Sequence, residues 1–339
     1  MRLHEDSEAF LYAVGLASRS GIRQQFLEKD YWVTFALNNL AESTFGNDVA
    51  FKGGTSLSKC YGLIERFSED VDLAIVRPHS LGSSQKKALI KKVESAVSKG
   101  LQVRHDPAGS KKSGMRRTTM YDFSQIVGQP GGGPTSEYLK LEITAYSKAH
   151  PTQMMEVESY LGKALREDGR SDLVEEFHLR PFQVQVLCLE RTFAEKVMAL
   201  VKRSYEQDPI RSLREKIRHI YDLHQMLARR PDMTTFLHGD DFFSFLDQVV
   251  EDDRENRTSD PTWLDRPCGE CCLFGSVDET WRGLESAYRE EFSQLLFGDL
   301  PGPEAVQESL RQIGGRLRAY DAPRHYLTFP PPGIPVRSS

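Results

Sequence analysis

The chain has 339 residues, of which 39% are apolar and 27% charged, values typical of a globular protein with room for about two domains. No apolar run reaches the roughly 18 residues that a membrane helix needs, and the start, MRLHEDSEAF, lacks the apolar core of a signal peptide. An odd number of cysteines, five, favours a reducing cytoplasm over a disulfide framework.

Charge is unevenly distributed along the chain, although the formal net charge is only −5. Residues 77–117 hold eleven Lys and Arg against two acids, whereas residues 231–300 hold seventeen acids against five Arg. A local basic block on an acidic protein predicts a polyanionic partner at one place. A solvated helix face followed by a basic loop would give the same counts.

The N-terminal part predicts helices followed by a strand and a glycine turn. Apolar residues recur at helical spacing over residues 5–43. Residues 48–51 predict a strand that ends at Gly53–Gly54. We expect one of the two hydroxyl residues that follow to cap a helix that brings Ile64 to the core.

A second short strand, predicted over residues 71–76, brings two aspartates together. Strand side chains alternate between the two faces, so Asp70 and Asp72 project on the same side. Two neighbouring carboxylates repel each other unless a cation lies between them, and Mg²⁺ prefers such oxygens. The simpler alternative is a surface strand with two solvated acids.

The glycine pair predicts a phosphate site, because glycine lets the backbone approach a ligand closely. A plain strand-to-helix turn would also need glycine. The residues that could contact phosphate at this turn are Lys52, Gly53, Gly54, Thr55, Ser56 and Ser68.

A lysine-rich helix and a strand are predicted over residues 86–103, and a turn-rich loop over residues 128–138. The alternating segment YLKLEITAY, residues 138–146, predicts a further strand. If its polar face lies beside the two aspartates, Glu142 is a third carboxylate of the site. Ordinary strand alternation would also place this acid in water.

From about Met154 onward the pattern is mostly helical. Thr192 and Glu195 have the spacing of a capping box, which predicts a helix to about residue 204, and another helix is predicted over residues 212–227. We expect domains at 1–150 and 151–321, followed by a proline-rich tail at 322–339.

Two residues of these helices are candidates for the site. Lys196 lies at the flank of an apolar stripe, from which an ammonium could reach a β- or γ-phosphate, or simply extend into water. Asp222 falls opposite the apolar stripe of its helix, where Arg218 could pair with it at the surface. Cys268, Cys271 and Cys272 are only a weak zinc signal, because a fourth ligand is missing.

Six segments resemble one known family in their order and spacing. They are FLEKDYW (26–32), KGGTSL (52–57), RFSEDVDL (66–73), LKLEI (139–143), TFAEKVMAL (192–200) and RHIYDL (218–223). The chain resembles the AbiEii/AbiGii toxin family of nucleotidyltransferases, members of the DNA polymerase β-like superfamily.

The resemblance implies an α/β (α+β) fold: a polymerase β-like core with a small mixed sheet, plus a mainly helical C-terminal domain that closes a cleft over the nucleotide. It implies a toxin of a toxin–antitoxin or phage-defence system, partnered by an AbiEi-type antitoxin. Such an enzyme uses Mg²⁺ or Mn²⁺ to transfer a nucleoside monophosphate from an NTP, in some relatives to the 3′ end of tRNA.

In this interpretation the catalytic residues are Asp70, Asp72, Glu142, Lys196 and Asp222. The metal ligands are Asp70, Asp72 and Glu142, and Lys196 joins the residues of the glycine turn in binding nucleotide. Two alternatives stay open: a nucleotidyltransferase that modifies a small molecule such as an antibiotic, and a non-catalytic protein that only binds nucleotide or antitoxin.

Overall fold

The computed structural model describes six ranges of the chain: residues 1–68, 70–104, 110–113, 115–128, 138–255 and 261–328. The chain divides into two compact units. The first comprises residues 1–192 together with 294–299, and the second comprises residues 193–293 and 300–339. The domain boundaries predicted at 150 and 321 stay a prediction.

The first unit is built on a mixed sheet with the strand order β3-β5-β6-β2-β1-β8-β7, and β4 pairs with β5 beside this path. The pairs β1–β8 and β2–β6 are parallel, and the other described pairs are antiparallel. The strands are β1 (Val49–Lys52), β2 (Asp70–Ile75), β3 (Gln102–Val103), β4 (Lys111–Lys112), β5 (Arg116–Asp122), β6 (Tyr138–Thr144), β7 (Thr152–Val157) and β8 (Phe182–Leu187).

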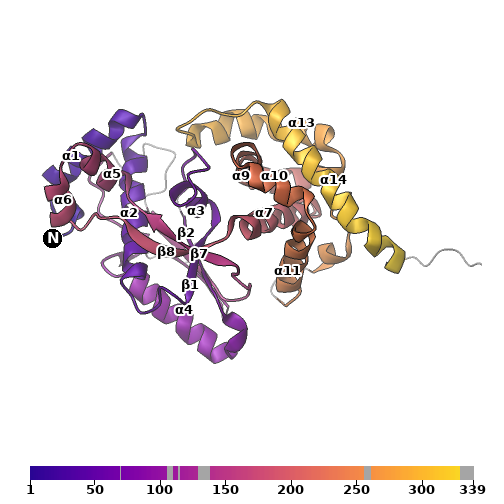
Figure 1. Ribbon diagram of the computed structural model, residues 1–339, viewed down its shortest axis with the longest axis horizontal. Helices are drawn as coiled ribbons and strands as arrows, with labels where there is room; N and C mark the ends of the chain where they lie inside the picture. Colours follow the sequence, from indigo (N-terminus) through magenta and orange to yellow (C-terminus); the bar gives the residue numbers. More distant parts are fainter. Residues whose placement is uncertain (69, 105–109, 114, 129–137, 256–260, 329–339) are drawn as a thin grey trace, which may run out of the picture. The chain divides into compact units, whose positions relative to one another are not determined.

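The helices of the first unit are α1 (Ser7–Ala17), α2 (Gln24–Ala41), α3 (Gly53–Lys59), α4 (Ser83–Val97), α5 (Tyr160–Glu167) and α6 (Ser171–Glu176). Figure 1 shows α2 and α4 beside the strands of the sheet. Short 3-10 turns lie at Leu3–Glu5, Ser18–Ser20 and Pro78–Ser80.

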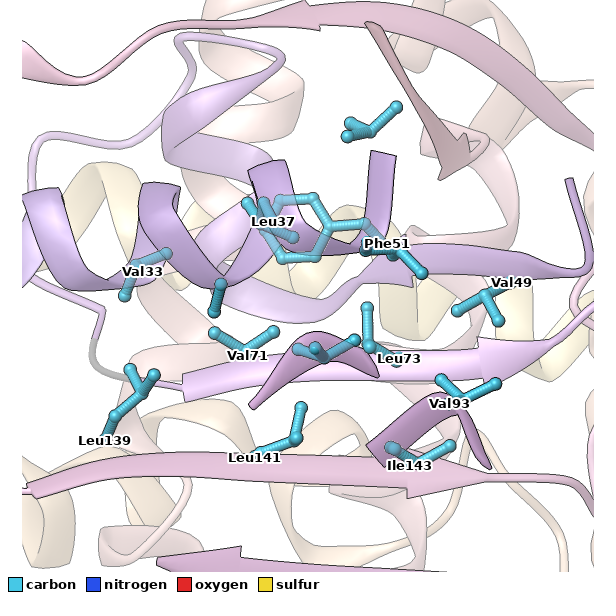
Figure 2. Packing of buried hydrophobic residues seen from close by; sticks show 14 of the residues in the cluster. Val33, Leu37, Val49, Phe51, Val71, Leu73, Val93, Leu139, Leu141 and Ile143 are labelled. Atoms are coloured by element: carbon cyan, nitrogen blue, oxygen red, sulfur yellow. The ribbon is translucent and has the colours of Figure 1, made fainter. Parts of the chain in front are cut away.

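One face of the sheet forms the main apolar core. Figure 2 shows side chains of β1, β2 and β6 packed against Val33 and Leu37 of α2 and Val93 of α4. Burial of one such side chain stabilises the fold by about 1.5–3 kcal/mol. Because Val71 and Leu73 point into this core, the alternate residues of β2 must point to the opposite face.

The second unit is helical in its described part. Its helices are α7 (Leu189–Ser204), which begins in the first unit, α8 (Pro209–Arg214), α9 (Ile217–Arg229), α10 (Pro231–His238), α11 (Asp241–Glu255), α12 (Cys272–Gly275), α13 (Val277–Ser286) and α14 (Pro303–Thr328). Shorter turns cover Thr262–Asp265 and Ala287–Glu291, and a further one, Phe292–Leu295, ends in the 294–299 segment of the first unit. Among the described residues, none of the helices is both long and apolar enough to cross a membrane.

Three helix predictions are wrong in detail. The helix after the glycine turn begins at Gly53 itself, has no side-chain cap at Thr55 or Ser56, and ends at Lys59, before Ile64. Helix α7 begins at Leu189, so the capping box expected at Thr192 and Glu195 does not start it. The helix predicted over residues 212–227 consists of two, α8 and α9.

The expectation of mostly helical structure after Met154 is also wrong in part. Strands β7 and β8 pair with each other and join the sheet through β1. The turn-rich loop falls largely on residues 129–137, and the end of the proline-rich tail on residues 329–339, both outside the described ranges.

Candidate active site

Two acidic residues of β2 project from the face of the sheet opposite the apolar core. Val71 and Leu73 are buried in that core, whereas Asp70 and Asp72 are partly buried on the other side. The predicted shared face of the two aspartates is confirmed, since strand alternation places both carboxylates on it.

Gly53 brings the glycine turn into direct contact with Asp72. Its φ of +81° lies in the left-handed region that favours glycine. A Cβ added at Gly53 would overlap Oδ2 of Asp72. The turn therefore needs glycine for two reasons, its conformation and the carboxylate that lies against it.

Gly54 lets the side chains of Arg66 and Ser68 lie close to the backbone of the turn. A Cβ at Gly54 would overlap the guanidinium of Arg66 and lie 3.0 Å from Oγ of Ser68. Thr55 connects the turn to β2: its hydroxyl donates to the carbonyl oxygen of Asp70 at 2.6 Å and lies 2.9 Å from Oγ of Ser68. These contacts fix the start of α3 against the strand that carries the acids.

The other two residues of the turn have different environments. Ser56 is fully buried, and its hydroxyl donates to the carbonyl oxygen of Gly53 at 2.9 Å. Lys52 ends β1 directly opposite Asp72 in the antiparallel pair. The phosphate-binding roles of all the turn residues stay predictions.

Glu142 lies beside Asp72, as the alternation of the 138–146 segment led us to expect. Strands β2 and β6 are parallel neighbours in the register Asp70 to Lys140 and Asp72 to Glu142. Three carboxylates, from Asp70, Asp72 and Glu142, therefore share one face of two adjacent strands.

Two cations of this face were not predicted from the sequence. Nζ of Lys140 lies 2.7 Å from Oδ2 of Asp70, and Nη2 of Arg116 on β5 lies 2.7 Å from Oε2 of Glu142. Burial acts to lower the pKa of Lys140, but the pair with Asp70 outweighs it, so this pKa is raised. Alternation along β6 already placed Lys140 on the acidic face and could have identified it.

The electrostatics of the site centre on Asp72. Burial, followed by the nearby charges of Asp70 and Glu142, raises the pKa of Asp72 to about 7. Burial and neighbouring negative charges disfavour the ionised form of this carboxyl group, so a bound cation would stabilise that form strongly.

The donor set fits a divalent metal ion. Carboxylate oxygens are the ligands that Mg²⁺ and Mn²⁺ prefer, and the raised pKa of Asp72 marks a place where added positive charge would be favourable. Within the described ranges, however, no three carboxylate, imidazole or thiol side chains stand close enough together to hold an ion. Asp70 and Glu142 are turned toward Lys140 and Arg116 instead.

Lys196 and Asp222 meet within the second unit. Nζ of Lys196 on α7 lies 2.7 Å from Oδ2 of Asp222 on α9, and both side chains are buried. The surface ion pair, which was the alternative interpretation of Asp222, is ruled out because this residue is 0% exposed. The catalytic roles of the two residues stay predictions.

The cysteine cluster is part of the packing of the second unit. Cys268 and Cys271 are buried, and Cys272 is half-buried. Burial raises the pKa of the Cys271 thiol to about 11, and no group of three possible metal ligands is found here among the described residues.

Comparison with known proteins identifies the family. Residues 36–312 match the family described as nucleotidyl transferase AbiEii toxin, type IV toxin–antitoxin system. The chain belongs to this family. The predicted resemblance to AbiEii is therefore confirmed, and the protein is a nucleotidyltransferase toxin of a type IV toxin–antitoxin system.

One solved structure supports the AbiEii fold. MenT4, a nucleotidyltransferase toxin from Mycobacterium tuberculosis H37Rv, is similar over 92% of this chain and 91% of that chain, with a TM-score of 0.55 and 17% identity. At this identity the similarity concerns the fold alone, and it confirms the predicted α/β nucleotidyltransferase fold. A search of curated proteins finds no match.

Proposed function

We propose that this AbiEii protein is a metal-dependent enzyme that transfers a nucleoside monophosphate from an NTP to the 3′ end of a tRNA. The observation that carries the proposal is the set of three carboxylates on one face of β2 and β6, where Asp72 lies opposite Glu142 in register and directly against Gly53 of the turn. Its finer parts, the metal and the RNA, are our inference from this geometry and from the family.

The residues of the turn would seat the triphosphate. Gly53 and Gly54 present no side chain on the approach to the backbone, and Lys52 ends the neighbouring strand opposite Asp72. The hydroxyls of Thr55 and Ser68 lie beside the turn, and we expect them to donate to phosphate once nucleotide binds. Ser56, whose hydroxyl donates to Gly53, would contribute by holding the shape of the turn.

The reaction is an in-line substitution at the α-phosphorus. The acceptor hydroxyl oxygen forms a bond to this phosphorus, the bond to the oxygen bridging the α- and β-phosphates breaks, and pyrophosphate leaves with that electron pair. The proton of the acceptor passes to the carboxylate cluster, where Glu142 is our candidate base. Positioning and charge neutralisation would supply most of the rate enhancement.

Asp70, Asp72 and Glu142 would hold the metal, which supplies positive charge that stabilises the attacking and leaving oxygens. Lys196, paired with Asp222 inside the second unit, would neutralise phosphate charge. This role would require Lys196 to exchange the carboxylate for a phosphate oxygen.

RNA is the acceptor class that the basic block favours. Lys87, Lys91 and Lys92 are exposed on α4, and the one acid of that helix, Glu94, is buried. Phosphate contacts of this kind supply affinity that does not depend on base sequence. An AbiEi-type antitoxin is the partner that we propose for the toxin in the cytoplasm.

Incubation of the purified protein with each labelled NTP and total tRNA tests the proposal. We expect label at the tRNA 3′ end with one NTP, dependence on Mg²⁺ or Mn²⁺, and loss of at least about 100-fold in rate in the double variant Asp70→Asn/Asp72→Asn. Aminoglycosides in place of tRNA probe the small-molecule alternative. Label on an aminoglycoside, or transfer that survives in the double variant, would contradict the proposal.

A further inference from the structure

Two cations stand among the carboxylates of the acidic face. Lys140 and Asp70 lie directly opposite each other in the parallel pair β2–β6, and their charged atoms are 2.7 Å apart. Arg116 lies on β5 two residues from Thr118, the register partner of Glu142, and reaches Glu142 diagonally at 2.7 Å. The strand register therefore builds both ion pairs into the sheet.

Both ion pairs can open without disturbing the core. The side chains of Lys140 and Asp70 are 30% and 33% exposed, and that of Arg116 is 45% exposed. The side chain of Glu142 is 17% exposed, so water screens both pairs only in part, and partly exposed pairs of this kind contribute modestly to fold stability. A ligand with a suitable charge can take the place of either partner.

Opposite charges already face each other among the described residues of this face before any ligand binds. Asp70 is paired with Lys140, Glu142 is paired with Arg116, and Lys52 lies opposite Asp72 in the strand register. A divalent cation arriving alone would have to displace Lys140 or Arg116 and would leave that cation without a counter-charge. A triphosphate arriving with the metal ion brings the missing negative charge.

We propose that Lys140 and Arg116 couple metal binding to nucleotide binding: they occupy the carboxylates in the free protein and transfer to phosphate oxygens when the NTP arrives, which frees the carboxylates for the ion. This inference rests on the proposed function, because it concerns the same site. A lysine ammonium is a point charge suited to one phosphate oxygen, and an arginine can bind two. Because coupling is reciprocal, the metal must tighten nucleotide binding by the same factor.

Mn²⁺ titration of the full-length protein, followed by the electron paramagnetic resonance signal of free Mn²⁺, tests the coupling. Each titration is run with and without a non-hydrolysable α,β-methylene NTP, and no acceptor is present. We expect the wild-type protein to bind Mn²⁺ at least about tenfold more tightly with the analogue. Lys140→Gln should bind Mn²⁺ about three- to tenfold more tightly than wild type without the analogue and lose most of the coupling.

Further variants make the result specific. Lys140→Met keeps the apolar stem and should behave as Lys140→Gln does, and Arg116→Gln should show the same change to a smaller degree because its side chain is more exposed. Lys163→Gln removes an exposed cation that pairs with Glu167 on α5, and should leave both affinities unchanged. Circular dichroism melting confirms that each variant is folded.

The inference fails if Lys140→Gln and Lys140→Met bind Mn²⁺ no more tightly than wild type in the absence of nucleotide. It also fails if these variants lose affinity for the analogue alone while the coupling persists. The proposed function is tested separately by transfer of label to tRNA. Absence of transfer by a wild-type protein whose Mn²⁺ binding is coupled as expected would therefore overturn the function and support the coupling.

Discussion

At the scale of single residues, Gly53 connects backbone conformation to the chemistry of the site. Its φ is +81°, and a side chain there would overlap the carboxylate of Asp72. Gly21 has nearly the same φ, +82°, but nothing lies within 4 Å of its missing Cβ. The two glycines separate the effect of backbone strain from the effect of the overlap.

We predict that Gly21→Ala lowers the free energy of unfolding by about 1 kcal/mol through strain alone and leaves transfer unchanged. Gly53→Ala should cost about 2–4 kcal/mol and reduce nucleotide transfer at least about tenfold, because Asp72 must move. Denaturant unfolding and the labelled-NTP assay measure the two quantities. Equal losses of stability in both variants would mean that Asp72 does not press on the turn.

Asp72 should make the stability of the metal-free protein depend on pH. Its folded-state pKa of about 7 lies above the ordinary value of 3.8, so the neutral form is favoured by folding. The stability that this provides is present below the ordinary pKa and is lost as the pH rises through about 7.

In EDTA, we therefore predict that the wild-type protein loses about 1–3 kcal/mol more stability than Asp72→Asn between pH 5 and pH 8. Urea unfolding of both proteins at the two pH values measures this difference. A parallel pH dependence of the two proteins would show that Asp72 ionises without cost in the folded state.

At the scale of elements, the ion pair of Lys196 and Asp222 joins α7 to α9 inside the second unit. Removal of Lys196 would take a positive charge away from a fully buried carboxylate, which costs up to about 3–5 kcal/mol. We predict that Lys196→Met is destabilised by this amount, and that Lys196→Met/Asp222→Leu recovers most of the stability but not the transfer activity. Thermal melting and the labelled-NTP assay distinguish the two effects.

The matched control is Lys163→Met, which breaks the exposed pair with Glu167 and should cost less than about 0.5 kcal/mol. A Lys196→Met protein with wild-type stability would show that the buried pair serves no structural purpose. Recovery of activity in the double variant would remove both residues from the catalytic proposal.

Strands with clear alternation could be predicted from the sequence, and those that depend on distant partners could not. Residues 138–146 alternate regularly, and β6 forms there with Leu139 and Leu141 buried. Strand β7 lies at the edge of the sheet as the described strands form it and pairs with β8, about 30 residues later. Its apolar residues give no comparable signal. Helix α7 begins at Leu189, three residues before the capping signal at Thr192. Thr192 is buried, and packing outweighs the local preference for a helix start at this residue.

Side-chain alternation within one strand could predict which residues of the candidate site share a face, but not which residues of neighbouring strands they contact. Alternation placed Asp70, Asp72 and Glu142 on polar faces, but the ion pair of Arg116 depends on the β5–β6 register, which one sequence does not reveal. The burial of Asp222 was missed for a related reason. A helical wheel shows which face is apolar but not that a second helix, α7, covers the polar side.

At the scale of the whole molecule, positive charge gathers in one region of a chain whose net charge is −5. Lys87, Lys91 and Lys92 are exposed on α4, while Glu94 of the same helix is buried and paired with Arg117. Residues four apart on a helix face are neighbours, so Lys87 and Lys91 form part of a continuous basic strip. A strip of this kind would attract a polyanion at distances of about a Debye length.

Replacement of these three lysines by glutamine should therefore weaken tRNA binding and reduce the slope of log affinity against log salt concentration by about 2. The affinity for NTP should be unchanged, because α4 packs on the apolar face of the sheet. Filter binding over a range of salt concentrations measures the slope. The control changes net charge equally by replacing three exposed cations that already pair with acids: Lys163, Arg170 and Arg180. A similar loss in both triple variants would assign the effect to net charge, whereas a loss confined to the α4 variant locates the RNA surface on that helix.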